Sequence, residues 1–161
     1  AGMSEGKQVV WIPSYGPEMR GGTANCTVVV SENRIGSPII TNPQAACVFN
    51  RPSLEKFGPL VKSGGMLLIN SSLIDTVSGR NDLSEFLIPA NDIALKIGNA
   101  KAANMVMLAA YVILSGIVKF DTILKMLEEK MGDKKALLEI NRHALADGRA
   151  LAEKLQQKVK V

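Results

Sequence analysis

The sequence has few of the side chains that hold metals, redox groups or nucleic-acid bases. Its 161 residues include one histidine and two cysteines, and 4% of them are aromatic. Cys26 and Cys47 lie in separate apolar runs without Cys-x-x-Cys or Cys/His spacing, which argues against an iron–sulfur cluster or a zinc site on this chain. We expect both cysteines to be small buried apolar residues of a protein from a reducing compartment.

The charge pattern gives no sign of a nucleic-acid surface. The net charge is +4, but the Lys and Arg residues are scattered and no basic stripe carries aromatic side chains. His143 lies in a predicted helix beside Arg142 and Asp147, which predicts an exposed side chain, and no nucleophile or carboxylate partner for catalysis is identifiable. We therefore expect no nucleic-acid partner and no catalytic residue on this chain.

One apolar segment resembles a membrane span in composition. Residues 102–118 carry no charge, but Asn104, Ser115 and Gly116 interrupt them, and their length is at the lower limit of the ~17–25 residues that a span needs. A helix buried between a sheet and neighbouring helices explains the segment better. With no secretory pattern either, we expect a cytoplasmic protein without a membrane partner.

Short apolar runs separated by helical patterns predict one layered α/β domain over residues 1–161. Its sheet should be mainly parallel and twisted, with helices on both faces, in a Rossmann-like arrangement. We expect Ser53 to cap the first helix. We expect either Asn91 or Asp92 to cap the second helix. The expected strands span residues 8–12, 24–31, 45–49, 66–70 and 85–88. The expected helices span residues 53–61, 91–97, 104–115, 121–131 and 134–158.

The most informative segment connects two of the predicted strands. Residues 14–27 read SYGPEMRGGTANCT. Pro17 fixes the backbone angle φ, and the Gly21-Gly22 pair can adopt angles closed to other residues, so that adjacent N–H groups point at one ligand. Arg20 adds a positive, fork-shaped donor. Considered alone, such a loop is also compatible with a plain structural connector.

The same segment resembles a loop of the γ subunits of 2-oxoacid:ferredoxin oxidoreductases. These oxidoreductases are thiamine-diphosphate enzymes that make acyl-CoA. The MRGGTANC form is most similar to the 2-oxoglutarate or branched-chain 2-oxoacid type. Weaker motifs follow in the same order along the chain. They read NRPSLEKF at residues 50–57, KSGG at 62–65, NSS at 70–72 and ANMVML at 103–108. The γ subunits carry an earlier strand and a Gly-rich loop, so we expect this sequence to lack both.

The resemblance implies a role in an assembled enzyme. The partners would be the alpha, beta and ferredoxin-like delta subunits, which hold thiamine diphosphate, magnesium and 4Fe-4S clusters, and this subunit would help to bind coenzyme A. The residues that match the motif are Arg20, Gly21, Gly22 and Thr23.

Two asparagines are further candidates for the coenzyme A site. Asn104 either caps its helix or contacts coenzyme A, and Asn70 either forms a turn or contacts a ligand at the end of a strand. Relatives often carry Arg where this chain has Ala102, and Lys101 is the candidate substitute.

Two classes of function remain open on the sequence. The first is the oxidoreductase subunit, with an indolepyruvate enzyme as a narrower variant. The second is a non-catalytic nucleotide-binding or scaffolding α/β module. Isolation of the native protein separates the two, because only the first predicts a large, iron-containing brown complex.

Overall fold

The structure is a computed structural model that describes residues 1–14, 24–37 and 39–159. Its strands are β1 (Gln8–Ser14), β2 (Asn25–Ser31), β3 (Ala45–Val48), β4 (Met66–Asn70) and β5 (Ser84–Ile88). Its α-helices are α1 (Arg51–Phe57), α2 (Ala90–Lys96), α3 (Ala103–Ser115), α4 (Phe120–Met131) and α5 (Lys135–Val159). The described residues also form the short 3-10 helices η1 (Met3–Glu5), η3 (Gly58–Leu60) and η4 (Ala100–Ala102).

A three-stranded parallel sheet forms the centre of the fold, in the order β3-β4-β5. The middle strand β4 is the continuous apolar run at residues 66–70, and Leu67, Leu68 and Ile69 are each 0% exposed. A strand can be apolar on both faces only where both faces are covered, so this pattern is typical of a parallel sheet between helices. The predicted α/β class is confirmed.

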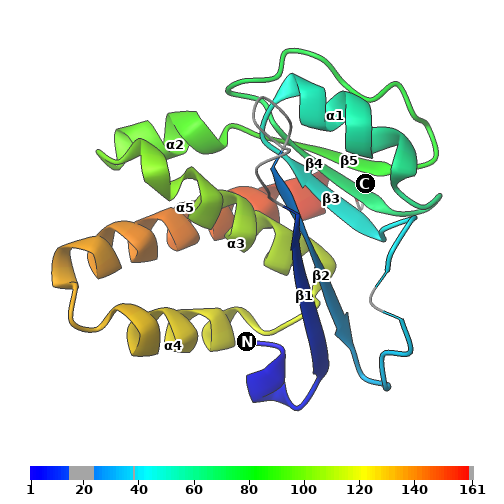
Figure 1. The fold of residues 1–161 in the computed structure, drawn as a ribbon. Coiled ribbons are helices and arrows are strands. Elements are labelled where there is room, and N and C mark those ends of the chain that lie inside the picture. The colour runs from blue at the N-terminus through cyan, green and yellow to red at the C-terminus, as the bar shows by residue number, and fades with distance from the viewer. Residues whose placement is uncertain (15–23, 38, 160–161) are drawn as a thin grey trace.

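Helices cover both faces of this sheet, as the sequence predicts (Figure 1). On one face, Leu67 and Ile69 pack with Leu54 of α1. On the other face, Leu68 and Phe86 belong to a larger core to which α2, α3 and α5 contribute. α4 packs on the outer side of this helical layer, where Leu127 joins residues of α3 and α5.

The strands β1 and β2 form a separate antiparallel hairpin, with Gln8 opposite Ser31 at one end and Ser14 opposite Asn25 at the other. The sequence predicts both strands, and their antiparallel pairing agrees with the ten residues between Ser14 and Asn25, because a parallel crossover needs about a dozen or more. None of the residues of β1 and β2 is buried. Trp11 and Val28 face each other across the two strands and are 60% and 56% exposed.

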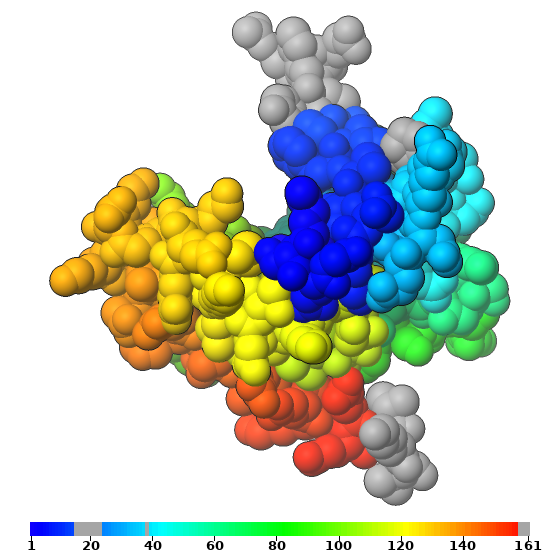
Figure 2. Space-filling model, turned by 90° about the horizontal axis from the view of Figure 1, so that it is seen from below, coloured from blue at the N-terminus to red at the C-terminus, as the bar shows by residue number. Residues whose placement is uncertain are grey.

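The base of the hairpin is tied to the helical layer by polar contacts. Glu5 Oε1 accepts a hydrogen bond from the Lys119 N–H at 2.8 Å, at the start of α4, and Lys7 Nζ donates to the Ile117 carbonyl at 2.7 Å. Figure 2 shows η1 and the base of β1 against α4. The hydrogen bond from Thr122 and that from Lys119 lower the pKa of Glu5, so its charged form stabilises this junction.

Two details of the predicted elements are wrong. Ser53 does not cap α1, because Asn50 occupies the cap position and its Oδ1 accepts from the Ser53 N–H at 2.9 Å. Cys26 and Cys47 are not buried but exposed, on the uncovered hairpin and on the outer strand β3. Solvent reaches part of Cys47, yet desolvation by the surrounding protein, with a smaller effect of Cys26, raises the pKa of its thiol to about 12.

Two other expectations agree with the structure. His143 is exposed on α5, as predicted. The apolar segment at residues 102–118 forms α3 and its flanks, with Val106, Ala109 and Ala110 each 0% exposed. No helix in the described part of the chain is both long and apolar enough to cross a membrane.

Candidate functional site

The Arg-Gly-Gly segment extends from the far end of the hairpin. β1 ends at Ser14 and β2 begins at Asn25, and these two residues are paired, so the two ends of the connection are held next to each other. Arg20, Gly21, Gly22 and Thr23, the predicted ligand contacts, lie outside the described residues. The structure therefore fixes the anchors of this loop, and the roles of the four residues remain predictions from the motif.

Asn104 lies in the first turn of α3, and its side chain is exposed. The capping alternative does not hold, because α3 begins after Ala102 and has no side-chain cap. The asparagine that caps this region is Asn99, whose Oδ1 accepts from the Lys101 N–H at 3.0 Å at the start of η4. Asn104 is thus left facing outward in the first turn of α3, where the helix dipole favours an anion.

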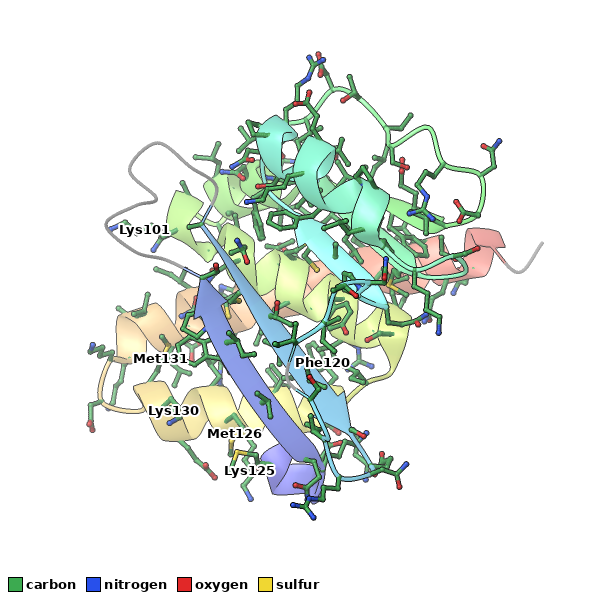
Figure 3. All side chains as sticks on the ribbon, turned by 45° about the vertical axis from the view of Figure 1, so that its right-hand side comes forward. Lys101, Phe120, Lys125, Met126, Lys130 and Met131 are labelled. Carbon is green, nitrogen blue, oxygen red and sulfur yellow. The ribbon has the colours of Figure 1, made fainter. Side chains whose placement is uncertain are left out.

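Lys101 is the exposed cation next to this helix start. Ala102 is 2% exposed and belongs to the main core, so an arginine at that position would have to displace packed side chains. Lys101, in contrast, extends from the surface, and Figure 3 shows it at the end of the molecule where β1 ends and β2 begins. The exposed amine at position 101 is therefore the cation that the local structure offers near the Asn104 turn.

Asn70 is the last residue of β4, and it is 0% exposed. Its Nδ2 donates to Asn91 Oδ1 at 2.7 Å, and its Oδ1 accepts from the Ala90 N–H at 3.2 Å. Ser72 continues the pattern, because its Oγ accepts from the Asp92 N–H at 3.0 Å. The segment after β4 therefore satisfies the first amides of α2.

This geometry corrects one expectation and adds a structural role to another residue. Asn70 bonds to the start of α2 and positions this helix against β4, and its contact with a ligand stays a prediction. Asn91 and Asp92 do not cap α2, whose cap position is Pro89. The sequence could not show this pairing, because the cap comes from a strand end about twenty residues earlier.

Replacing Asn70 with alanine should destabilise the protein. The change leaves the Ala90 N–H and the Asn91 Oδ1 without their partner in a buried place, which typically costs about 1–3 kcal/mol. Thermal unfolding should show the loss, while Asn81→Ala, at an exposed position, should leave Tm nearly unchanged. An Asn70→Ala protein with normal Tm and weakened ligand binding would instead identify Asn70 as a ligand contact.

The described residues do not fit a metal or cluster site. They include no group of three or more His, Cys, Asp or Glu side chains close enough to hold an ion. Cys26 and Cys47 are free thiols on different sheets, and His143 lies on α5. A 4Fe-4S cluster needs four ligands, most often cysteines, so the donor set of this chain does not supply one.

A surface groove of about 410 Å³ lies elsewhere, between α1 and the segment before β5, and sequence reasoning missed it. Arg51 and Arg80 line it. Both are engaged within the protein: Arg51 pairs with Glu55, and Arg80 pairs with Asp82 and donates to the Val61 carbonyl at 2.6 Å. The described residues that line the groove include neither Asn70 nor Asn104, and Arg80 stabilises the η3 segment that follows α1.

Together these observations define a layered α/β domain with two candidate segments, the connection between β1 and β2 and the start of α3. Comparison with known proteins identifies its family. Residues 1–151 match the family described as pyruvate ferredoxin/flavodoxin oxidoreductase. The chain belongs to this family, and its similarity to γ-type subunits confirms the resemblance read from the motif.

Two relatives illustrate the similarity. The chain is 36% identical over 156 residues to the ketoisovalerate oxidoreductase subunit VorA of Methanothermobacter marburgensis, covering 96% of this chain and 32% of the relative. It is 30% identical over 157 residues to the 2-oxoglutarate synthase subunit KorC of Methanocaldococcus jannaschii, covering 96% of this chain and 83% of the relative. The chain thus spans about a third of the length of the VorA relative.

Two solved structures share the fold. The keto/oxoacid ferredoxin oxidoreductase γ subunit from Geobacter sulfurreducens superposes with a TM-score of 0.80 at 28% identity, covering 94% of this chain and 84% of that one. The 2-oxoglutarate:ferredoxin oxidoreductase from Magnetococcus marinus, with 2-oxoglutarate, coenzyme A and succinyl-CoA bound, superposes with a TM-score of 0.79 at 21% identity. That match covers 92% of this chain and 26% of that one, and at this identity it speaks for the fold alone.

Proposed function

We propose that this chain forms part of the coenzyme A site of a thiamine-diphosphate-dependent 2-oxoacid:ferredoxin oxidoreductase. The observation that carries the proposal is the SYGPEMRGGTANC motif at residues 14–26, on a chain that belongs to the family. The reaction converts a 2-oxoacid and coenzyme A to an acyl-CoA and CO₂, with two electrons passing to ferredoxin. Partner subunits of the alpha, beta and ferredoxin-like delta types would hold thiamine diphosphate, magnesium and the 4Fe-4S clusters in a cytoplasmic complex.

The residues of this chain suit the binding of the anionic co-substrate rather than the chemistry itself. Arg20 can donate two parallel hydrogen bonds to a phosphate, and the N–H groups of Gly21 and Gly22 can line a concave anion site. Asn104 and Lys101 would add an amide and a positive charge at the start of α3.

The relatives support a proposal for the class of substrate. We propose a 2-oxoacid of the branched-chain or 2-oxoglutarate type, because the similar proteins include the ketoisovalerate and 2-oxoglutarate subunits VorA and KorC. The partner subunits hold the thiamine diphosphate on which the 2-oxoacid reacts, so they would make most of the selection. Activity of the reconstituted complex against a panel of 2-oxoacids identifies the substrate.

The role of the α3 start is testable in the assembled enzyme. Lys101→Ala and Asn104→Ala should each raise the KM for coenzyme A, by about 2- to 10-fold for one exposed polar contact, while the KM for the 2-oxoacid stays constant. Lys96→Ala removes an exposed lysine from α2 and is the matched control. Unchanged KM values for coenzyme A in both variants would show that the start of α3 is not part of the coenzyme A site.

The non-catalytic module is the competing function, and purification from the native source separates it from the proposal. An oxidoreductase subunit should co-purify in a large brown complex with iron and thiamine diphosphate. The isolated chain should bind neither, as metal analysis and absorption spectra can show. A colourless monomer or dimer from the native source would favour the module instead.

A further inference from the structure

The hairpin of β1 and β2 is bonded to the helical layer at the end opposite its loop. Glu5 Oε1 accepts from the Lys119 N–H at 2.8 Å, and Lys7 Nζ donates to the Ile117 carbonyl at 2.7 Å. Both partners lie in the short connection between α3 and α4. The side chain of Lys7 is 17% exposed and also pairs with Glu32 at 3.0 Å, so one ammonium group joins both strand ends of the hairpin to the end of α3.

The base of the hairpin also packs closely against the start of η1. Gly2, at the N-cap of η1, is buried, and a Cβ atom there would lie 2.9 Å from Val9 Cγ2 and 3.2 Å from Val30 Cγ1. Val9 and Val30 are paired across β1 and β2. Because η1 touches both strands, a displacement of Glu5 or Lys7 is passed to the whole hairpin.

The hairpin and α3 are of similar length and connect the same two ends of the molecule. α3 has 13 residues, about 20 Å at 1.5 Å per residue, and β1 has 7 residues, about 20 Å at 3.3 Å per residue. Figure 3 shows Lys101, beside the start of α3, at the end where β1 ends and β2 begins. A tilt of about 5° at the base moves the far end of such a strand by about 2 Å.

We propose that Glu5 and Lys7 are positioning residues for the binding of coenzyme A. They hold the hairpin at one angle to α3 and thereby place Ser14 and Asn25, the anchors of the Arg-Gly-Gly loop. Their side chains lie at the opposite end of the hairpin and act through it, without touching the ligand. This role rests on the proposed function, because it takes the loop as the element that binds coenzyme A.

The experiment measures kinetics of the assembled enzyme with four variants of this chain. Glu5→Ala and Lys7→Met each remove one base contact and should raise the KM for coenzyme A by roughly 3- to 10-fold, because a misplacement of about 1 Å already weakens a site. The kcat at saturating coenzyme A and the KM for the 2-oxoacid should stay constant. Glu5→Gln keeps an oxygen acceptor and should restore most of the natural KM. Lys119→Ala is the matched control, because it removes a neighbouring exposed cation but keeps the backbone N–H that donates to Glu5.

A second measurement reports on the angle of the hairpin without coenzyme A. Nitroxide side chains are introduced at Val28 on β2 and Leu95 on α2, which are 56% and 61% exposed. Pulsed electron paramagnetic resonance then gives the distance between hairpin and helix. Glu5→Ala and Lys7→Met should shift or broaden this distance by about 2 Å or more, as the tilt requires, and Lys119→Ala should not.

The results distinguish a failure of the positioning role from a failure of the proposed function. A natural KM for coenzyme A in Glu5→Ala and Lys7→Met overturns the positioning role, whether or not the hairpin moves. A raised KM without a change of the measured distance, or an equal effect of Lys119→Ala, overturns it too. If Lys7→Met does not assemble, Glu5→Ala alone carries the test. Arg20→Ala tests the proposed function separately: a raised KM for coenzyme A in that variant alone leaves the function standing and removes the positioning role.

Discussion

Replacing Arg20 with alanine in the assembled enzyme is expected to raise the KM for coenzyme A by roughly 10- to 150-fold. A charge-assisted contact between a guanidinium and a phosphate typically contributes about 1.5–3 kcal/mol, which corresponds to that range. The 2-oxoacid-driven reduction that precedes the entry of coenzyme A should change much less, because the proposed complex has its thiamine site on the partner subunits. Steady-state and single-turnover kinetics of the same preparation measure the two effects separately.

The matched control is Arg34→Ala, which removes an exposed arginine from the segment after β2. It should leave both kinetic steps unchanged. If Arg20→Ala assembles normally and keeps its KM for coenzyme A, Arg20 serves the subunit interface. Loss of the early reduction step instead would assign Arg20 to the 2-oxoacid site.

The Gly148→Ala variant should be less stable than the natural chain, although alanine is normally the better helix former by about 1 kcal/mol. Gly148 is buried in the middle of α5, where this helix crosses α3. A Cβ atom at this position would lie 2.4 Å from the Val106 carbonyl oxygen and 2.9 Å from Ala109 Cβ. Backbone atoms of α3 cannot move aside independently, so the two helices must separate.

Such overpacking typically costs about 1–3 kcal/mol, and in a chain of this size each kcal/mol lowers Tm by about 2–4 °C. Thermal unfolding measures the change. Gly36→Ala is the control, because no atom lies within 4 Å of its Cβ position and its φ is not in the left-handed region. Equal or higher Tm for Gly148→Ala would show that α3 and α5 pack less closely than the structure indicates.

The sequence predicts strands and helices well where complete burial requires an apolar sequence. The apolar run at residues 66–70 matches β4, and the uncharged segment matches α3, because a strand or helix covered on every side must be apolar throughout. The caps are harder to predict. Asn50 and Ser53 are both good capping residues three positions apart, and only the backbone geometry selects Asn50.

Contacts between residues that are far apart in the sequence explain the remaining differences between the predictions and the structure. Asn70 Oδ1 accepts a hydrogen bond from the first amide of α2, which lies 20 residues later in the sequence. A local sequence pattern therefore could not distinguish a helix cap from a ligand contact. The two cysteines lie in apolar strands, as expected, but on edges that the described residues leave uncovered. At the candidate site, the structure adds that Asn104 faces outward and that Ala102 is core, whereas the Arg20 loop is known from its motif alone.

The most direct test of the central proposal is photo-crosslinking of the assembled enzyme with a photoreactive coenzyme A analogue, followed by peptide mapping. The proposal predicts that the label is found on the peptide spanning residues 14–27 of this chain and that unlabelled coenzyme A suppresses it. A secondary label near Lys101 is also expected. Labelling confined to the partner subunits, in an enzyme that still makes acyl-CoA, would contradict a role for this chain in the coenzyme A site.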